Sequence, residues 1–154
     1  MADAPLTIRP FQPADQLPVR ELVLAGLAER WGRLDPSRNP DLDDIQTSYV
    51  ARGDTVLVVE AGGQIAATGA LVCSSHGVGQ IVRMSVDASF RRQGIARTLV
   101  AALLAEARKR GFQRIIVETT YDWQSAIALY QQCGFVPYDR DSEDVYLELT
   151  LAEP

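Results

Sequence analysis

The alternation of hydrophobic and polar positions changes period most sharply between residues 81 and 104. Residues 81–86 are mainly apolar and β-branched, which predicts a strand. Residues 87–93 are polar and rich in arginine, which predicts a tight connection. From Gly94 onward the apolar positions follow the spacing of an α-helix, at Ile95, Leu99, Ala102 and Leu103. The pattern therefore predicts a strand, a polar turn and a helix in direct succession.

The same patterns predict the other elements. Alternating or β-branched runs predict strands at residues 6–11, 55–61, 64–74, 78–86, 114–120, 135–138 and 145–151. Helical spacing predicts helices that begin near Pro13, span residues 41–52, run from Gly94 to Gly111, and span residues 123–133. Asp122 is the expected N-cap of the last helix.

These elements predict an α/β fold with one mixed sheet of about seven strands and helices on both faces. The strand–helix–strand unit of residues 81–120 supplies its parallel part, because parallel neighbours need a crossover connection. The length of 154 residues predicts a single domain over residues 1–154.

Composition and charge exclude several function classes. The net charge of −5 disfavours a nucleic-acid binder, which would usually show a basic face. No apolar run approaches the roughly 20 residues of a membrane span, and no signal peptide is visible at the N-terminus. Cys73 and Cys133 lie in apolar contexts, so we expect buried free thiols and a cytoplasmic location. No metal site is expected, and His76, beside a glycine, is expected in a turn.

The polar turn before Gly94 has the composition of an anion site. A helix N-terminus offers unpaired N–H groups and a partial positive charge, and phosphate is the usual guest. Gly94 lets a ligand approach the backbone closely, and three arginines nearby suit phosphate oxygens: Arg91, Arg92 and Arg97. This R-x-x-G-x-A pattern, with Ala96 last, is also compatible with a plain turn and solvated arginines. The P-loop and dinucleotide-binding patterns are absent.

A second motif lies downstream, in the run SAIALYQQCGF at residues 125–135. It matches the pattern A-[IV]-x-L-Y-x-x-x-G-F at Ala126, Ile127, Leu129, Tyr130, Gly134 and Phe135. Together with the R-x-x-G-x-A turn, in this order and spacing, the chain resembles the Gcn5-related N-acetyltransferase (GNAT) family. The resemblance covers most of the chain, from Ile8 to Leu151.

The resemblance implies a GNAT-like acyl-CoA N-acyltransferase fold and acetyl transfer from acetyl-CoA to a primary amine of a small molecule, peptide or protein. It implies that the backbone at the end of the central strand contacts the pantetheine arm, at Met84, Ser85 and Val86. It implies that the following turn holds the pyrophosphate, at Arg91, Arg92, Gln93, Gly94, Ile95, Ala96 and Arg97. Where relatives often have a cofactor-contacting asparagine, this chain has Trp123.

Two catalytic roles follow from the resemblance. Tyr130 corresponds to the tyrosine that protonates the leaving thiolate, and the alternative is a packed aromatic. Glu118, twelve residues earlier, corresponds to a glutamate proposed as base in some members. The alternatives are a carboxylate on the solvent side or paired with an arginine, with water relaying the proton.

The acceptor and the assembly are less defined. Two acidic segments favour a cationic amine by electrostatic steering: Asp35, Asp41, Asp43 and Asp44 in one, and Asp139, Asp141, Glu143 and Asp144 in the other. The family's habits make a homodimer an expectation. The alternatives to an N-acetyltransferase are a CoA-binding regulatory module without catalysis and an enzyme of another class that binds a nucleotide.

Overall fold

The computed structural model describes residues 5–32 and 36–151, which form a seven-stranded mixed sheet with helices on both faces, as predicted. The strands are β1 (Leu6–Pro10), β2 (Thr55–Ala61), β3 (Gln64–Ser75), β4 (Val78–Val86), β5 (Arg114–Thr120), β6 (Val136–Arg140) and β7 (Asp144–Thr150). The helices are α1 (Gln16–Trp31), α2 (Ile45–Ser48), α3 (Ile95–Lys109) and α4 (Gln124–Gln132). The strand order is β1-β2-β3-β4-β5-β7-β6.

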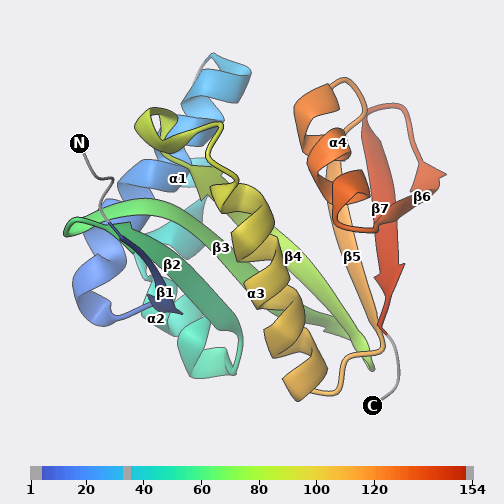
Figure 1. Ribbon diagram of the computed structural model, residues 1–154, viewed down its shortest axis with the longest axis horizontal. Helices are drawn as coiled ribbons and strands as arrows, with labels where there is room; N and C mark the ends of the chain where they lie inside the picture. Colours follow the sequence, from blue (N-terminus) through green and yellow to red (C-terminus); the bar gives the residue numbers. More distant parts are fainter. Residues whose placement is uncertain (1–4, 33–35, 152–154) are drawn as a thin grey trace.

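The helices pack on opposite faces of the sheet and form one hydrophobic cluster with each face (Figure 1). Alternate residues of β2 and β3 pack against α1 and α2, where Val58, Leu42 and Val19 are buried. The intervening residues pack against α3 and α4, where Leu71, Leu99 and Tyr130 belong to one cluster. The period-2 alternation of the strands thus divides the core in two.

β4 and β5 are parallel neighbours only at one end. Their pairing runs from Val78 opposite Arg114 to Gln80 opposite Ile116, although both strands continue further. Figure 1 shows the two strands diverging beyond this point, so that the sheet opens toward the turn before α3. At the paired end Gly79 keeps the layers close, because a Cβ there would lie 3.0 Å from Ile115 Cδ1.

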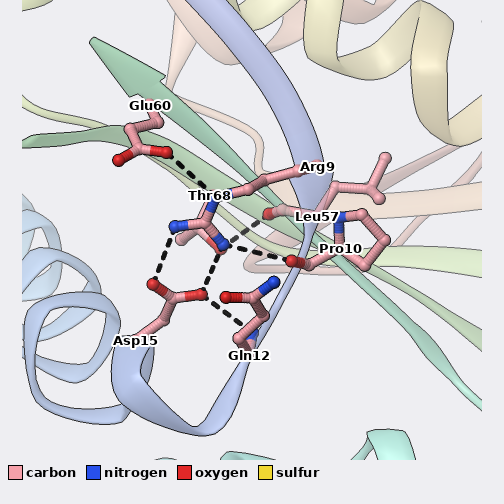
Figure 2. A network of polar contacts seen from close by, with 7 residues as sticks. All are labelled: Arg9, Pro10, Gln12, Asp15, Leu57, Glu60 and Thr68. Atoms are coloured by element: carbon pink, nitrogen blue, oxygen red, sulfur yellow. Dashed lines mark hydrogen bonds and ion pairs between the residues drawn. The ribbon is translucent and has the colours of Figure 1, made fainter. Parts of the chain in front are cut away.

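A polar network ties the N-terminal strand to the sheet and to α1 (Figure 2). The Arg9 guanidinium donates to Glu60 on β2 at 3.0 Å and to both carboxylate oxygens of Asp15 at 2.7 and 2.9 Å. Asp15 also accepts the Gln12 N–H at 2.8 Å, which caps the turn Pro13–Asp15 that leads into α1. Asp15 is buried, so this network satisfies a charge that would otherwise be costly.

Three predictions about local structure are wrong. The helix expected at residues 41–52 is broken into Pro40–Asp43, α2 and Val50–Arg52, because Asp44 leaves the helical conformation and caps α2 through its bond to the Thr47 N–H. Asp122 does not cap α4, because its carboxylate binds Arg30. Cys73 is exposed rather than buried, and Cys133 is half-buried. Among the described helices, none has the length and hydrophobicity to cross a membrane.

Candidate functional site

The turn before α3 presents an unusual run of free backbone donors. The N–H groups from Arg91 to Arg97 find no hydrogen-bond acceptor within residues 5–32 and 36–151, because the helix begins at Ile95 and the loop turns away from β4. Gly94 adopts φ +76°, a left-handed conformation that suits glycine, and a Cβ added at this position would meet no atom within 4 Å. Such an array is suited to an anion.

The three arginines of the turn differ in their partners. Arg91 binds Glu29 of α1 through both terminal nitrogens, at 2.5 and 2.6 Å. This ion pair lowers the pKa of the Glu29 carboxyl. Arg92 and Arg97 form no ion pair with any residue that the structure describes, so their charges remain available to a ligand.

A groove of about 530 Å³ continues from this turn between α3 and α4. Its walls include Gly94, Arg97 and Ala101 from the α3 side and Gln132 and Cys133 from the end of α4. Burial raises the pKa of the Cys133 thiol, so the thiol stays protonated at neutral pH. The groove thus combines an anion-binding end with a neutral, partly apolar wall.

Met84, Ser85 and Val86 lie at the end of β4, where the strand has separated from β5. On one side they belong to the ladder with β3, in which Thr68 pairs with Ser85. On the other side no strand of the described residues pairs with them, so their backbone groups on that edge are free to bind a ligand.

Tyr130 is a buried aromatic of α4. Its ring meets Phe135 edge-on with centroids 5.6 Å apart, and 7% of the residue is exposed. The hydroxyl makes no hydrogen bond to any described residue. Burial raises the pKa of Tyr130, and the nearby Cys133 adds to this. The phenol is therefore a protonated donor at neutral pH.

Glu118 lies on the opposite face of β5 from the buried Val117. It is exposed, which fits the solvent-side alternative, and it forms no ion pair with any arginine in residues 5–32 and 36–151. Partial desolvation of its carboxyl raises the pKa of Glu118, although the residue as a whole is exposed, and the neighbouring carboxyls of Asp144 and Asp141 raise it further. Glu118 and Tyr130 are thus on opposite faces of the sheet, on either side of the place where β4 and β5 separate.

The sequence did not point to Arg30, which joins α1 to the loop after β5. Its guanidinium donates to Thr120 at 2.9 Å and to Asp122 at 2.6 Å, and it lies 5.2 Å from the ring centroids of both Trp31 and Trp123. Trp123, in the place of the expected asparagine, is therefore part of a cation–π arrangement. The contacts with Thr120 and Asp122 join residues about 90 apart, and no local pattern signals them.

Comparisons with known proteins identify the family of this chain. The family model described as the acetyltransferase (GNAT) family matches residues 19–135. N-acetyltransferase 8 of Rattus norvegicus is 40% identical over 101 residues, which are 62% of this chain and 46% of that protein. The chain therefore spans about half the length of the mammalian relatives it matches.

Solved structures share the fold at low sequence identity. A GNAT acetyltransferase from Staphylococcus aureus superposes with a TM-score of 0.84 at 17% identity, covering 96% of this chain and 100% of that chain. The PaiA N-acetyltransferase of Thermoplasma acidophilum, solved with coenzyme A, gives 0.83 at 14% identity, covering 96% and 99%. Since the family model spans most of the sequence and both motifs, this chain belongs to the acetyltransferase (GNAT) family.

Proposed function

We propose that the protein is an acetyl-CoA-dependent N-acetyltransferase that acts on a primary amine. The observation that carries the proposal is the run of free N–H groups from Arg91 to Arg97, placed beside the unpaired edge of β4. A concentrated set of N–H donors suits a diphosphate, and an extended backbone edge with free N–H groups suits a thioester. Membership of the GNAT family supports the same reaction class.

The residues present fit acetyl-CoA. The pyrophosphate would lie against the N–H groups around Gly94, with Arg92 and Arg97 nearby, and the groove toward Cys133 would take the nucleotide end. The pantetheine arm would follow the free edge of β4 at Met84, Ser85 and Val86. The PaiA structure, which has the same fold, was solved with coenzyme A.

Tyr130 and Glu118 would divide the proton transfers. The amine nitrogen forms a bond to the thioester carbonyl carbon, and the carbon–sulfur bond breaks. Glu118, directly or through water, takes the proton that the amine loses, and its raised pKa brings it nearer to neutral pH. Tyr130 gives its proton to the departing thiolate. Their positions on opposite faces suit a donor and an acceptor that meet where the strands separate.

A cationic amine is the acceptor that we propose, although only one of the two predicted acidic segments supports it. Asp41, Asp43 and Asp44 already bind Arg83, Arg20 and Thr47, and Asp35 lies outside the described residues. In the other segment Asp141 also accepts hydrogen bonds, from Tyr146 and two backbone N–H groups, but Asp144 and Asp141 still raise the pKa of Glu118 by repulsion, which a bound cation would relieve.

Release of free CoA thiol from acetyl-CoA, with a panel of polyamines, basic peptides and neutral or anionic amines, tests the proposal. Amine-stimulated release, highest for cations at low salt, is expected. Calorimetry should show binding of CoA but not of ATP or NAD. CoA binding without release for any amine would indicate a regulatory module, and failure to bind CoA would refute the proposal. The cytoplasmic location, the homodimer and the single domain stay predictions.

A further inference from the structure

β4 contains an extra residue at the point where it reaches the proposed site. Thr68 of β3 pairs with Ser85 of β4, and Ala70 pairs with Val82. Between these two pairs β4 advances by three residues, whereas β3 advances by two. Arg83 takes up the difference with φ +56°, a left-handed conformation that a residue with a Cβ adopts at a cost. This is a β-bulge, which re-aims the residues that follow it.

The bulge places two consecutive side chains on one face of the sheet. Val82 packs in the cluster of α1 and α2, and Arg83 also reaches that side, where it binds Asp41 through Nε at 3.0 Å and Nη2 at 2.7 Å. Arg83 also donates to Asn39 at 3.1 Å, and Tyr49 donates to Asp41 at 2.5 Å. Burial by itself would raise the pKa of Asp41, and the bonds from Arg83 and Tyr49 more than reverse this.

The two residues after Arg83 are also fixed by specific contacts. A Cβ on Gly69 would lie 2.3 Å from the Met84 sulfur, so Gly69 makes the space that Met84 occupies. Ser85 donates to the Leu22 carbonyl at 3.3 Å, and a Cβ on Gly26 of α1 would lie 2.8 Å from its hydroxyl. The backbone of Arg83–Ser85 is therefore held from both faces of the sheet.

We propose that Arg83 is a positioning residue. Its bidentate bond to Asp41 holds the strained bulge and so aims the backbone groups of Met84 and Ser85 along the free edge of β4. The inference rests on the proposed function, because it gives those groups the thioester and the pantetheine arm to bind. It assigns Arg83 no contact with the reacting atoms.

Replacement of Arg83 by two small residues tests this role. Ala removes the ion pair and keeps the conformational cost, whereas Gly removes the ion pair and adopts φ +56° freely. The turnover of Arg83→Gly in thiol release should therefore exceed that of Arg83→Ala, by about tenfold. Asp41→Asn should lower turnover in the wild-type background and have little further effect in the Arg83→Gly background. Arg20→Ala, which removes an exposed pair with Asp43, is the matched control and should leave turnover unchanged.

Backbone chemical shifts of Met84 and Ser85 give a readout that does not need activity. They should match wild type in Arg83→Gly and differ in Arg83→Ala and Asp41→Asn. Equal turnover in the Gly and Ala variants, or unchanged shifts in Asp41→Asn, would overturn the positioning role. If the wild-type protein neither bound CoA nor released thiol, the proposed function would fail instead, and the shifts would still report whether Asp41 holds the bulge.

Discussion

The side chain of Tyr130 is held by packing of its ring, so loss of the hydroxyl should not destabilise the fold. The edge-on contact with Phe135 uses the ring, and the hydroxyl has no partner among the described residues. Tyr130→Phe should therefore keep the melting temperature and CoA affinity while turnover falls about 10² to 10⁴-fold. Single-turnover thiol release measures the loss, with the exposed Tyr138→Phe as control. A Tyr130→Phe enzyme with wild-type turnover would remove the acid role.

Glu118 and Asp144 offer a test of the base through their mutual repulsion. Asp144 raises the pKa of Glu118, so the acidic limb of the pH–rate profile should lie above that of an isolated glutamate. Asp144→Asn removes the repulsion, lowers the pKa of Glu118 and should move this limb to lower pH. Glu118→Gln should lower the rate at neutral pH and recover partly at high pH, where more amine is neutral. Profiles parallel to wild type in both variants would leave Glu118 without a catalytic role.

At the scale of the elements, the two ends of α3 provide a matched pair of glycines. Gly94 and Gly111 have φ of +76° and +79°, and an added Cβ at either would meet nothing within 4 Å. Asn tolerates this conformation better than other residues with a Cβ, so Gly94→Asn and Gly111→Asn should change the melting temperature similarly. Only Gly94→Asn should weaken CoA binding, by about tenfold or more, because it keeps the phosphate from the backbone. Calorimetry that finds equal CoA affinity in both variants would contradict the phosphate assignment.

The β1–α1 connection is held by Asp15 as well as by the buried Phe11. Hydrogen bonds from Arg9 lower the pKa of Asp15, so the network stabilises the fold above the ordinary aspartate pKa of about 4. Its contribution should be lost as the pH falls through the lowered pKa. Asp15→Asn should destabilise by about 1–3 kcal/mol at pH 7, and the difference from wild type should shrink below about pH 4. Urea unfolding measures this, with Asp43→Asn in an exposed pair as control, where a change within about 1 kcal/mol is expected.

At the scale of the whole molecule, periodicity predicted the sheet well and tertiary contacts poorly. The bounds of β2, β4 and β5 are the same as the predicted bounds, because the pattern of side chains within each strand is enough to predict that strand. The predicted helix at residues 41–52 failed because Asp41 binds Arg83 and because Asp44 starts a separate helix, α2, which it caps through the Thr47 N–H. One local signal went unused: Arg83 interrupts an apolar strand, which is where the bulge lies.

The site could be predicted as a set of positions but not as an arrangement. The two motifs located the turn at Gly94 and the aromatic at Tyr130. They did not show that Glu118 lies on the other face of the sheet, because that depends on the register of β5 with β7. Nor could they show that Glu29 binds Arg91 from 62 residues away.

The last turn of α1 binds both loops that flank the separated strands, Glu29 to Arg91 and Arg30 to Asp122. A phosphate of CoA would compete with Glu29 for the Arg91 guanidinium, so Glu29→Gln should tighten CoA binding a few-fold at low salt. Glu21→Gln, an equal charge change on the same helix, should not, and calorimetry at two salt concentrations compares them.

Competition of this kind has a thermodynamic consequence. If CoA binding releases Glu29, it also changes the end of α1. Any ligand whose binding moves the end of α1 is then coupled to CoA. The factor by which that ligand changes the affinity for CoA equals the factor by which CoA changes the affinity for that ligand. An acceptor bound on the α1 face would then be such a ligand. The order in which the two substrates bind would be biased by a single carboxylate that contacts neither of them.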